Sequence, residues 1–99
     1  MSRWTAVKNY INSKEIGDII WRGDLLLKAY GTTKVNSGFM TTVDNYRSAL
    51  AHVGVLVTVD RGFYMIKAHI NESTTTTELY KAAFSHDYRQ WFHDIIKHE

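Results

Sequence analysis

The stretch TTVDNYRSALAHVGVLVTVDRGFYMI, residues 41–66, decides the fold. In its first half apolar residues recur at spacings of three and four, which is the period of a helix; they are Val43, Tyr46, Leu50 and Val53. A threonine hydroxyl at residues 41–42, followed by the carboxylate of Asp44, is typical of a helix start. Gly54 is typical of a helix end. These signals predict a helix over about residues 42–53 with its apolar face in the core.

The second half of this stretch predicts a β-hairpin. Residues 55–59 (VLVTV) and 63–67 (FYMIK) are rich in β-branched and aromatic residues. They are separated by Asp60-Arg61-Gly62, a three-residue link with glycine at the position that needs a left-handed conformation. We therefore expect two antiparallel strands with Arg61 at the apex of the turn.

Upstream, the pattern predicts two further helices and a short strand. Trp4, Val7 and Ile11 recur at helical spacing, which predicts a helix over residues 3–12. Ile19-Ile20-Trp21 predicts a strand. A leucine-rich helix is expected directly after it, over residues 22–30, because Gly31 supplies a left-handed end. Residues 32–40 (TTKVNSGFM) contain several turn-forming residues and are expected to form a loop.

Downstream, four threonines (residues 74–77) indicate a linker that runs into a helix cap, with a boundary near residue 71. An aromatic stripe follows at spacings of four, four, three and four, which predicts an amphipathic helix; its residues are Tyr80, Phe84, Tyr88, Trp91 and Ile95. A break is expected near Ser85-His86. The stripe must be covered, either by the first helix, where Trp4 and Tyr10 offer surface, or by a second copy of the chain.

Composition restricts the class of protein. The 99 residues contain no cysteine, which excludes a disulfide framework and a cysteine-ligated metal site. No apolar run approaches the roughly 18 residues that span a bilayer, and the polar N-terminus lacks the apolar segment of a signal peptide. We expect one compact domain in the cytoplasm. Residues 1–70 carry nine Lys and Arg against five Asp and Glu, whereas residues 71–99 carry three against five.

The order of these elements over residues 3–70 resembles a winged helix-turn-helix DNA-binding domain of the small type common in phages and mobile elements. The residues that carry the resemblance are Ile16-Gly17-Asp18-Ile19-Ile20 with Arg22 and Leu25-Leu26, the opening Thr42-Val43-Asp44-Asn45-Tyr46-Arg47, Gly54, and Gly62-Phe63-Tyr64. The expected fold class is α/β, mostly α. It comprises a winged helix-turn-helix over residues 1–70, with three helices, a short strand and a hairpin wing, and an appended helix over residues 71–99 in the same compact unit.

The resemblance implies that residues 42–52 form the recognition helix in the major groove and that the hairpin is a wing on the flanking backbone. The helical period independently places Thr41, Asp44, Asn45, Ser48 and His52 opposite the apolar face, with Arg47 on one flank. The candidate DNA contacts are Thr41, Thr42, Asn45, Arg47, Ser48 and His52, with Arg61 at the hairpin apex, Lys67 on its second strand, and Lys34 with Thr33 in the preceding loop. Asn45 suits adenine, and the cations suit phosphates.

The function expected from this pattern is sequence-specific binding of duplex DNA by a transcriptional regulator of phage type, either monomeric or as a homodimer through the C-terminal helix. Asp44 on the DNA-facing side and the small positive charge leave a second class open, a protein-interaction module such as a phage-encoded inhibitor of a host protein. A structural component of a larger assembly is a third. We expect neither catalysis nor a metal or cofactor. Ser85-His86-Asp87 are consecutive residues of a helix, so their side chains point in different directions and cannot form a catalytic relay. Asp94 with His93 and His98 lacks a further ligand at metal-binding spacing, and the glycines form no phosphate-binding motif.

Overall fold

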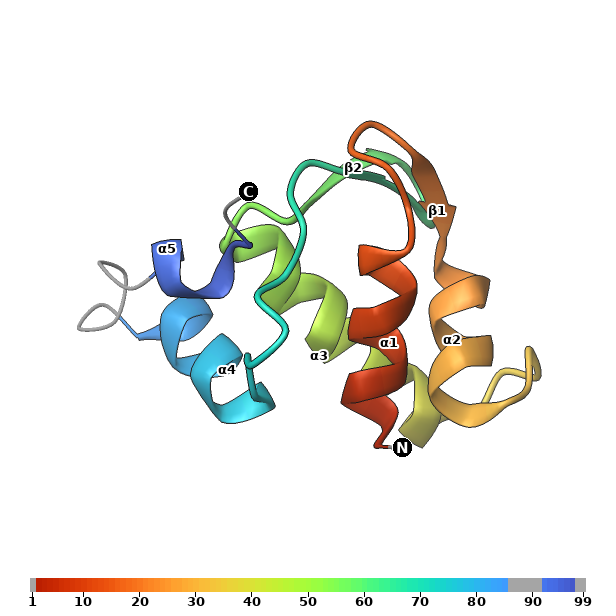
Figure 1. Ribbon diagram of the computed structural model, residues 1–99. Coiled ribbons are helices and arrows are strands. Elements are labelled where there is room, and N and C mark those ends of the chain that lie inside the picture. Colours follow the sequence, from red (N-terminus) through yellow and green to blue (C-terminus); the bar gives the residue numbers. More distant parts are fainter. Residues whose placement is uncertain (1, 86–91, 98–99) are drawn as a thin grey trace.

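The computed structural model describes residues 2–85 and 92–97 (Figure 1). The elements in chain order are α1 (Arg3–Asn12), β1 (Ile19–Trp21), α2 (Arg22–Tyr30), α3 (Ser37–His52), β2 (Leu56–Asp60), β3 (Phe63–Ile66), α4 (Thr76–Phe84) and α5 (Phe92–Ile95). The three strands form one antiparallel sheet in the order β1-β3-β2. The protein is therefore α/β with more helix than strand, as expected.

The helices enclose one hydrophobic core, and the sheet closes one end of it. α1 packs on α2, and α3 packs on both α2 and α4; Figure 1 shows the sheet above these helices. The expected apolar face of α3 is confirmed, because Val43, Tyr46, Leu50 and Val53 are all buried. Residues of α4 and α5 belong to the same buried cluster, so the C-terminal segment shares the core of the first 70 residues.

Several expected boundaries are confirmed. α1, β1 and α2 have the bounds that the sequence predicts, and Gly31 ends α2 with a left-handed φ of 72°. The hairpin is present, with its strands within one residue of the expected runs. Its turn contains Gly62 at φ 78°, and a bulge lies between Thr58 and Asp60. Local periodicity and glycine placement were thus sufficient for these elements.

The expected start of α3 is wrong. The helix begins at Ser37, and the side chain of Asn36 accepts hydrogen bonds from the backbone N–H groups of Gly38 and Phe39. The hydroxyl of Thr41 donates to the carbonyl of Ser37 at 2.8 Å, so it lies within the helix and does not cap it. The second half of the expected loop, residues 37–40, is therefore helical. The physical reason is that Asn36 supplies the cap earlier in the chain, while Phe39 stacks on Tyr30 with ring centroids 3.9 Å apart.

The C-terminal segment differs from one continuous helix. Thr75 caps α4 through a capping box with Glu78. α4 ends at Phe84, because Ser85 has extended backbone angles, so the expected break is present. Tyr88 and Trp91 of the aromatic stripe lie outside the described residues. The linker contacts α1, where the indole Nε1 of Trp4 donates to the carbonyl of Thr74 at 2.7 Å, whereas α4 itself packs on α3.

Within residues 2–85 and 92–97, no helix is both long and apolar enough to cross a membrane.

Candidate nucleic-acid interface

One side of α3 carries a polar stripe that no other element covers along most of its length. Thr41, Asn45 and His52 are exposed and Ser48 is half-buried. Their spacings of four, three and four place them on one face of the helix. The amide of Asn45 forms no side-chain hydrogen bond within the described part of the chain. This amide is therefore available to an external partner with a matched donor and acceptor.

Asp44 flanks this stripe and is paired. Its carboxylate lies 2.9 Å from the guanidinium of Arg22, the first residue of α2. Both side chains are partly exposed, so the pair contributes little to stability. The pair matters more for the surface charge. The guanidinium of Arg22 offsets the repulsion that an unpaired Asp44 carboxylate would exert on a phosphate.

Arg47 extends toward the sheet. Its guanidinium carbon lies 5.8 Å from the ring centroid of Tyr64 on β3, a cation–π contact. Burial raises the pKa of the Tyr64 hydroxyl, although the charges of Arg47 and Arg22 act in the opposite direction. These two cations therefore lie where α3, the start of α2 and the sheet meet.

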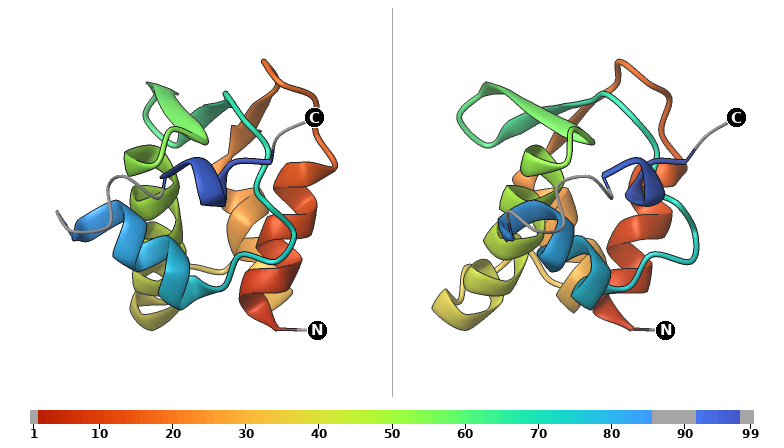
Figure 2. Two further views of the ribbon diagram at one scale, coloured as in Figure 1. Left: turned by 60° about the vertical axis from the view of Figure 1, so that its left-hand side comes forward. Right: turned by 90° about the vertical axis from the view of Figure 1, so that its left-hand side faces the viewer.

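The turn of the hairpin is attached to the start of α2. The backbone N–H of Arg22 donates to the carbonyl of Gly62 at 2.8 Å, and Trp21 pairs with Phe63 in the sheet. Arg61 is exposed at the turn. In the right-hand view of Figure 2, the hairpin turn and the first turns of α3 project toward the same side of the molecule.

A cavity of about 340 Å³ lies between these segments. Its lining combines the hairpin turn, the start of α2, the loop before α3 and the first turns of α3; it includes Arg61, Trp21, Arg22, Thr33, Val35 and Met40. The cavity brings Arg61 and Thr33, both expected site residues, to one place. It also shows that the hairpin turn lies close to the first half of α3.

The other expected contacts, among them His52 at the end of the polar stripe, do not line this cavity. Thr42 is on the other flank of α3, where its hydroxyl donates to the carbonyl of Gly38 at 3.4 Å and its side chain lines a separate cavity. Lys67 follows β3, at the end of the hairpin away from the turn. Lys34 is exposed in the loop before α3. His52 is near the end of α3, with its ring edge-on to Phe84 of α4 at 5.0 Å.

Sequence reasoning missed Trp21 and the pairing role of Arg22. The Trp21 side chain is 47% exposed, although it stands in a strand. A Cβ at residue 23 would lie 2.4 Å from its ring, so only glycine allows the ring to lie over the start of α2 in this position. The sequence Trp21-Arg22-Gly23 contains this signal, but its meaning depends on the pairing of β1 with the distant β3.

Comparison with models of known protein families, with curated protein sequences and with solved structures finds no match. Within the described residues, no three His, Asp or Glu side chains lie close enough together to hold a metal ion. His86, Asp87 and His98, which were considered for catalysis or metal binding, lie outside the described residues. The functional argument therefore rests on the residues and the geometry given above.

Proposed function

We propose that this protein is a winged helix-turn-helix protein that binds duplex DNA in a sequence-specific manner, as a cytoplasmic transcriptional regulator of phage or mobile-element type. α3 would lie in the major groove, and the β2–β3 hairpin would act as the wing. The observation that carries the proposal is the polar stripe of α3 beside a hairpin turn that presents Arg61. The element order and the sheet order β1-β3-β2 are compatible with this docking geometry.

The cations around the stripe supply the general affinity for DNA. Arg47 and Arg61 lie near the junction between α3 and the hairpin turn, and Lys34 lies in the loop before α3, whereas Arg22 is paired with Asp44. Each phosphate that they neutralise releases bound counterions, so the affinity falls as the salt concentration rises. Arg22 also offsets the charge of Asp44, so the carboxylate on the DNA-facing side of α3 no longer argues against DNA binding.

The polar stripe supplies base discrimination. The carboxamide of Asn45 offers a donor and an acceptor that match the N7 and N6 edge of adenine, and such a pair discriminates by about 1–3 kcal/mol. Thr41 and Ser48, on the same face, offer hydroxyls to bases or phosphates. The position of Arg61 on the turn does not imply a contact with a particular base, so we assign it to the DNA backbone or the minor groove.

The test is fluorescence anisotropy of labelled duplexes at about 50 and 200 mM salt, after selection of a preferred site from random sequences. Arg61→Ala is expected to weaken binding to all duplexes and to lower the salt slope by about one, whereas Asn45→Ala reduces discrimination between duplexes. Lys28→Ala is the matched control, because it removes one exposed charge from α2 next to Tyr10. Absence of salt-dependent binding at micromolar protein contradicts the proposal.

A protein-interaction module is the second candidate, and the outer face of the sheet favours it. Trp21 pairs with Phe63, and Met65 lies between Ile19 and Val57. Ile19, Trp21, Val57 and Phe63 are exposed, and together they form an apolar patch of the kind that marks interaction sites. If Phe63→Ser and Val57→Ser abolish binding to a host protein while the chain binds no DNA, this second function replaces the first.

A homodimer through the C-terminal segment is part of the proposal. Phe84, the last residue of α4, is 53% exposed and touches only the rings of Tyr80 and His52 among the described aromatic side chains. A second copy would cover it and place two recognition helices about 34 Å apart. Light scattering tests this: a mass that stays at one chain across the concentration range removes the dimer from the proposal without affecting DNA binding by the monomer.

A further inference from the structure

A second cavity, of about 520 Å³, lies away from the polar stripe of α3. It is bounded by the start of α1, the start of α4 and the other flank of α3, which contributes Thr42 and Tyr46. Figure 1 shows α1 and α4 beginning at the end of the molecule opposite the sheet and the hairpin. The volume is within the range of about 300–1,000 Å³ that is typical of ligand pockets.

The lining of this cavity is cationic and rich in hydroxyls. Among the described residues that line it, two are cations, Arg3 and Lys8, seven are Ser or Thr, and none is acidic. The nearby carboxylate of Glu72 is bound by Lys97 at 3.1 Å, and that of Glu78 is held in the capping box. The positive ends of two helix dipoles, at Ser2 and Thr75, face the same region. The cavity therefore favours an anion.

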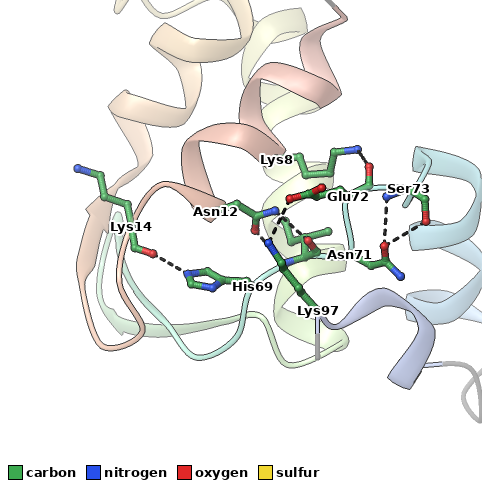
Figure 3. A network of polar contacts seen from close by, with 9 residues as sticks. Lys8, Asn12, Lys14, His69, Asn71, Glu72, Ser73 and Lys97 are labelled. Carbon is green, nitrogen blue, oxygen red and sulfur yellow. Dashed lines mark hydrogen bonds and ion pairs between the residues drawn. The ribbon is translucent and has the colours of Figure 1, made fainter. Parts of the chain in front are cut away.

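Lys8 is the central observation. Its side chain is only 7% exposed, and its ammonium donates to the carbonyls of Glu72 at 2.6 Å and Thr74 at 3.3 Å. Figure 3 shows Lys8 reaching the main chain of Glu72, whose carboxylate is directed to Lys97. Within the described residues, no carboxylate forms an ion pair with Lys8. The ammonium also lies 5.9 Å from the ring centroid of Trp4, so its partners are two carbonyls and an aromatic ring. A buried charge without a countercharge is costly, and an anion in the cavity would supply one.

Thr74 supplies a second, independent observation. Its side chain is 2% exposed, it lines this cavity, and its Oγ1 has no hydrogen-bond partner in the described structure. Buried hydroxyls normally have a partner, so Thr74 leaves an unsatisfied hydrogen-bonding group beside the cavity. The same residue binds Lys8 and the indole of Trp4 through its carbonyl, which holds the wall in place.

We propose that this cavity binds the phosphate group of a small phosphorylated molecule. A phosphate monoester carries a charge of about −1.5 to −2 and three acceptor oxygens, which matches the two cations and the unpaired hydroxyl of Thr74. Four other lining hydroxyls already donate within the chain, those of Ser2, Thr42, Ser73 and Thr75. Arg3 lies at the cavity with its guanidinium 4.7 Å from the ring centroid of Tyr30, and the rings of Trp4 and Tyr46 offer apolar surface to the rest of the ligand. Because Thr42 and Tyr46 belong to α3, an occupied cavity also contacts the proposed recognition helix.

The test is a titration of the isotope-labelled protein with inorganic phosphate, followed by NMR and compared with sodium chloride at equal ionic strength. We expect saturable shifts at the backbone amides of Arg3 and Trp4 and at the indole N–H of Trp4. Removal of one charged partner is expected to raise the Kd about tenfold, both in Arg3→Gln and in Lys8→Met. Lys28→Met is the matched control, and its Kd should equal that of the unaltered protein.

Arg3 is exposed, so Arg3→Gln keeps the test decisive if Lys8→Met does not fold. Three results would overturn the proposal. The shifts do not saturate, sodium chloride reproduces them, or Arg3→Gln and Lys28→Met change them equally. DNA anisotropy separates the two sources of phosphate. Unchanged DNA affinity in Arg3→Gln supports a free phosphorylated ligand, whereas a lower salt slope assigns the site to a phosphate of the DNA backbone. A protein that binds phosphate but no DNA contradicts only the proposed DNA function.

Discussion

The contribution of Asp44 to the surface charge depends on a neighbour that only the fold reveals. In the sequence, its carboxylate stands on the side of a helix that would face phosphates. In the fold, Arg22 approaches it from α2 at 2.9 Å, so the local charge is close to neutral. Arg22 is 22 residues away in the chain, and no local pattern connects the two. The charge of a binding surface is therefore a property of residue pairs that the fold brings together.

The Asp44→Asn substitution tests this view. It removes one negative charge and releases the guanidinium of Arg22, so the affinity for DNA is expected to rise and its salt slope to steepen. The free energy of unfolding should change by less than about 1 kcal/mol, because the pair is partly exposed. Anisotropy and urea unfolding measure the two effects. A loss of DNA affinity in a folded Asp44→Asn protein would contradict our assignment of this face.

Tyr10 makes a pH-dependent contribution to stability. Burial raises its pKa to about 12, with a further contribution from Asp24, whose carboxylate accepts the phenol hydrogen at 3.2 Å. The fold thus favours the protonated phenol, and this contribution is complete below pH 10. It is lost as the pH rises from 10 toward 12, so the free energy of unfolding should fall in that window. Urea unfolding should show a smaller decline for Tyr10→Phe than for the unaltered protein; equal declines would contradict the assignment.

At the scale of elements, α3 shows what the sequence can predict. The spacing of Val43, Tyr46, Leu50 and Val53 correctly gives the buried face, because a helix that packs on a core needs an apolar side. The first turn was not predictable in the same way. Asn36-Ser37-Gly38 has the composition of a loop, but in the fold the side chain of Asn36 caps the helix and Phe39 stacks on Tyr30 of α2.

The position of the α3 cap is directly testable. Asn36→Ala removes the acceptor for two backbone N–H groups and should lower the free energy of unfolding by about 1 kcal/mol. Thr41→Ala is the matched comparison, because its hydroxyl bonds a carbonyl within the helix and should cost less. Urea unfolding of both proteins measures the difference. If Thr41→Ala is the more destabilising of the two, the helix starts where the sequence alone suggested.

At the scale of the whole molecule, the candidate site was only partly accessible to sequence reasoning. The exposed stripe of α3 follows from helical period alone. The gathering of Arg61, Trp21 and Arg22 around one cavity does not, because it requires β1 to pair with β3 across more than forty residues of chain. Likewise, Thr42 is adjacent to the stripe in sequence but lies on the opposite flank, next to α1. The periodicity of the sequence predicts the exposed face of a helix but not which distant strands pair.

The single core predicts a sharp contrast between the two faces of α3. Leu50 is fully buried where α3 meets its neighbours, so Leu50→Ala should lower the free energy of unfolding by about 2–5 kcal/mol. Asn45→Ala, on the exposed face of the same helix, should change it by less than about 0.5 kcal/mol. Thermal or urea unfolding compares them. Similar midpoints for the two variants would mean that the core face is misplaced.

The hydrogen bond from Arg22 to Gly62 has a consequence for how the molecule opens. Because the hairpin turn is held to the first residue of α2, and β1 is continuous with that helix, the hairpin cannot detach without disturbing the helical core. Its amide hydrogens should therefore exchange with solvent in the same cooperative event as those of α2, not as those of an independent flap. A turn of this kind loses little further conformational entropy when it contacts a partner, since folding has already ordered it.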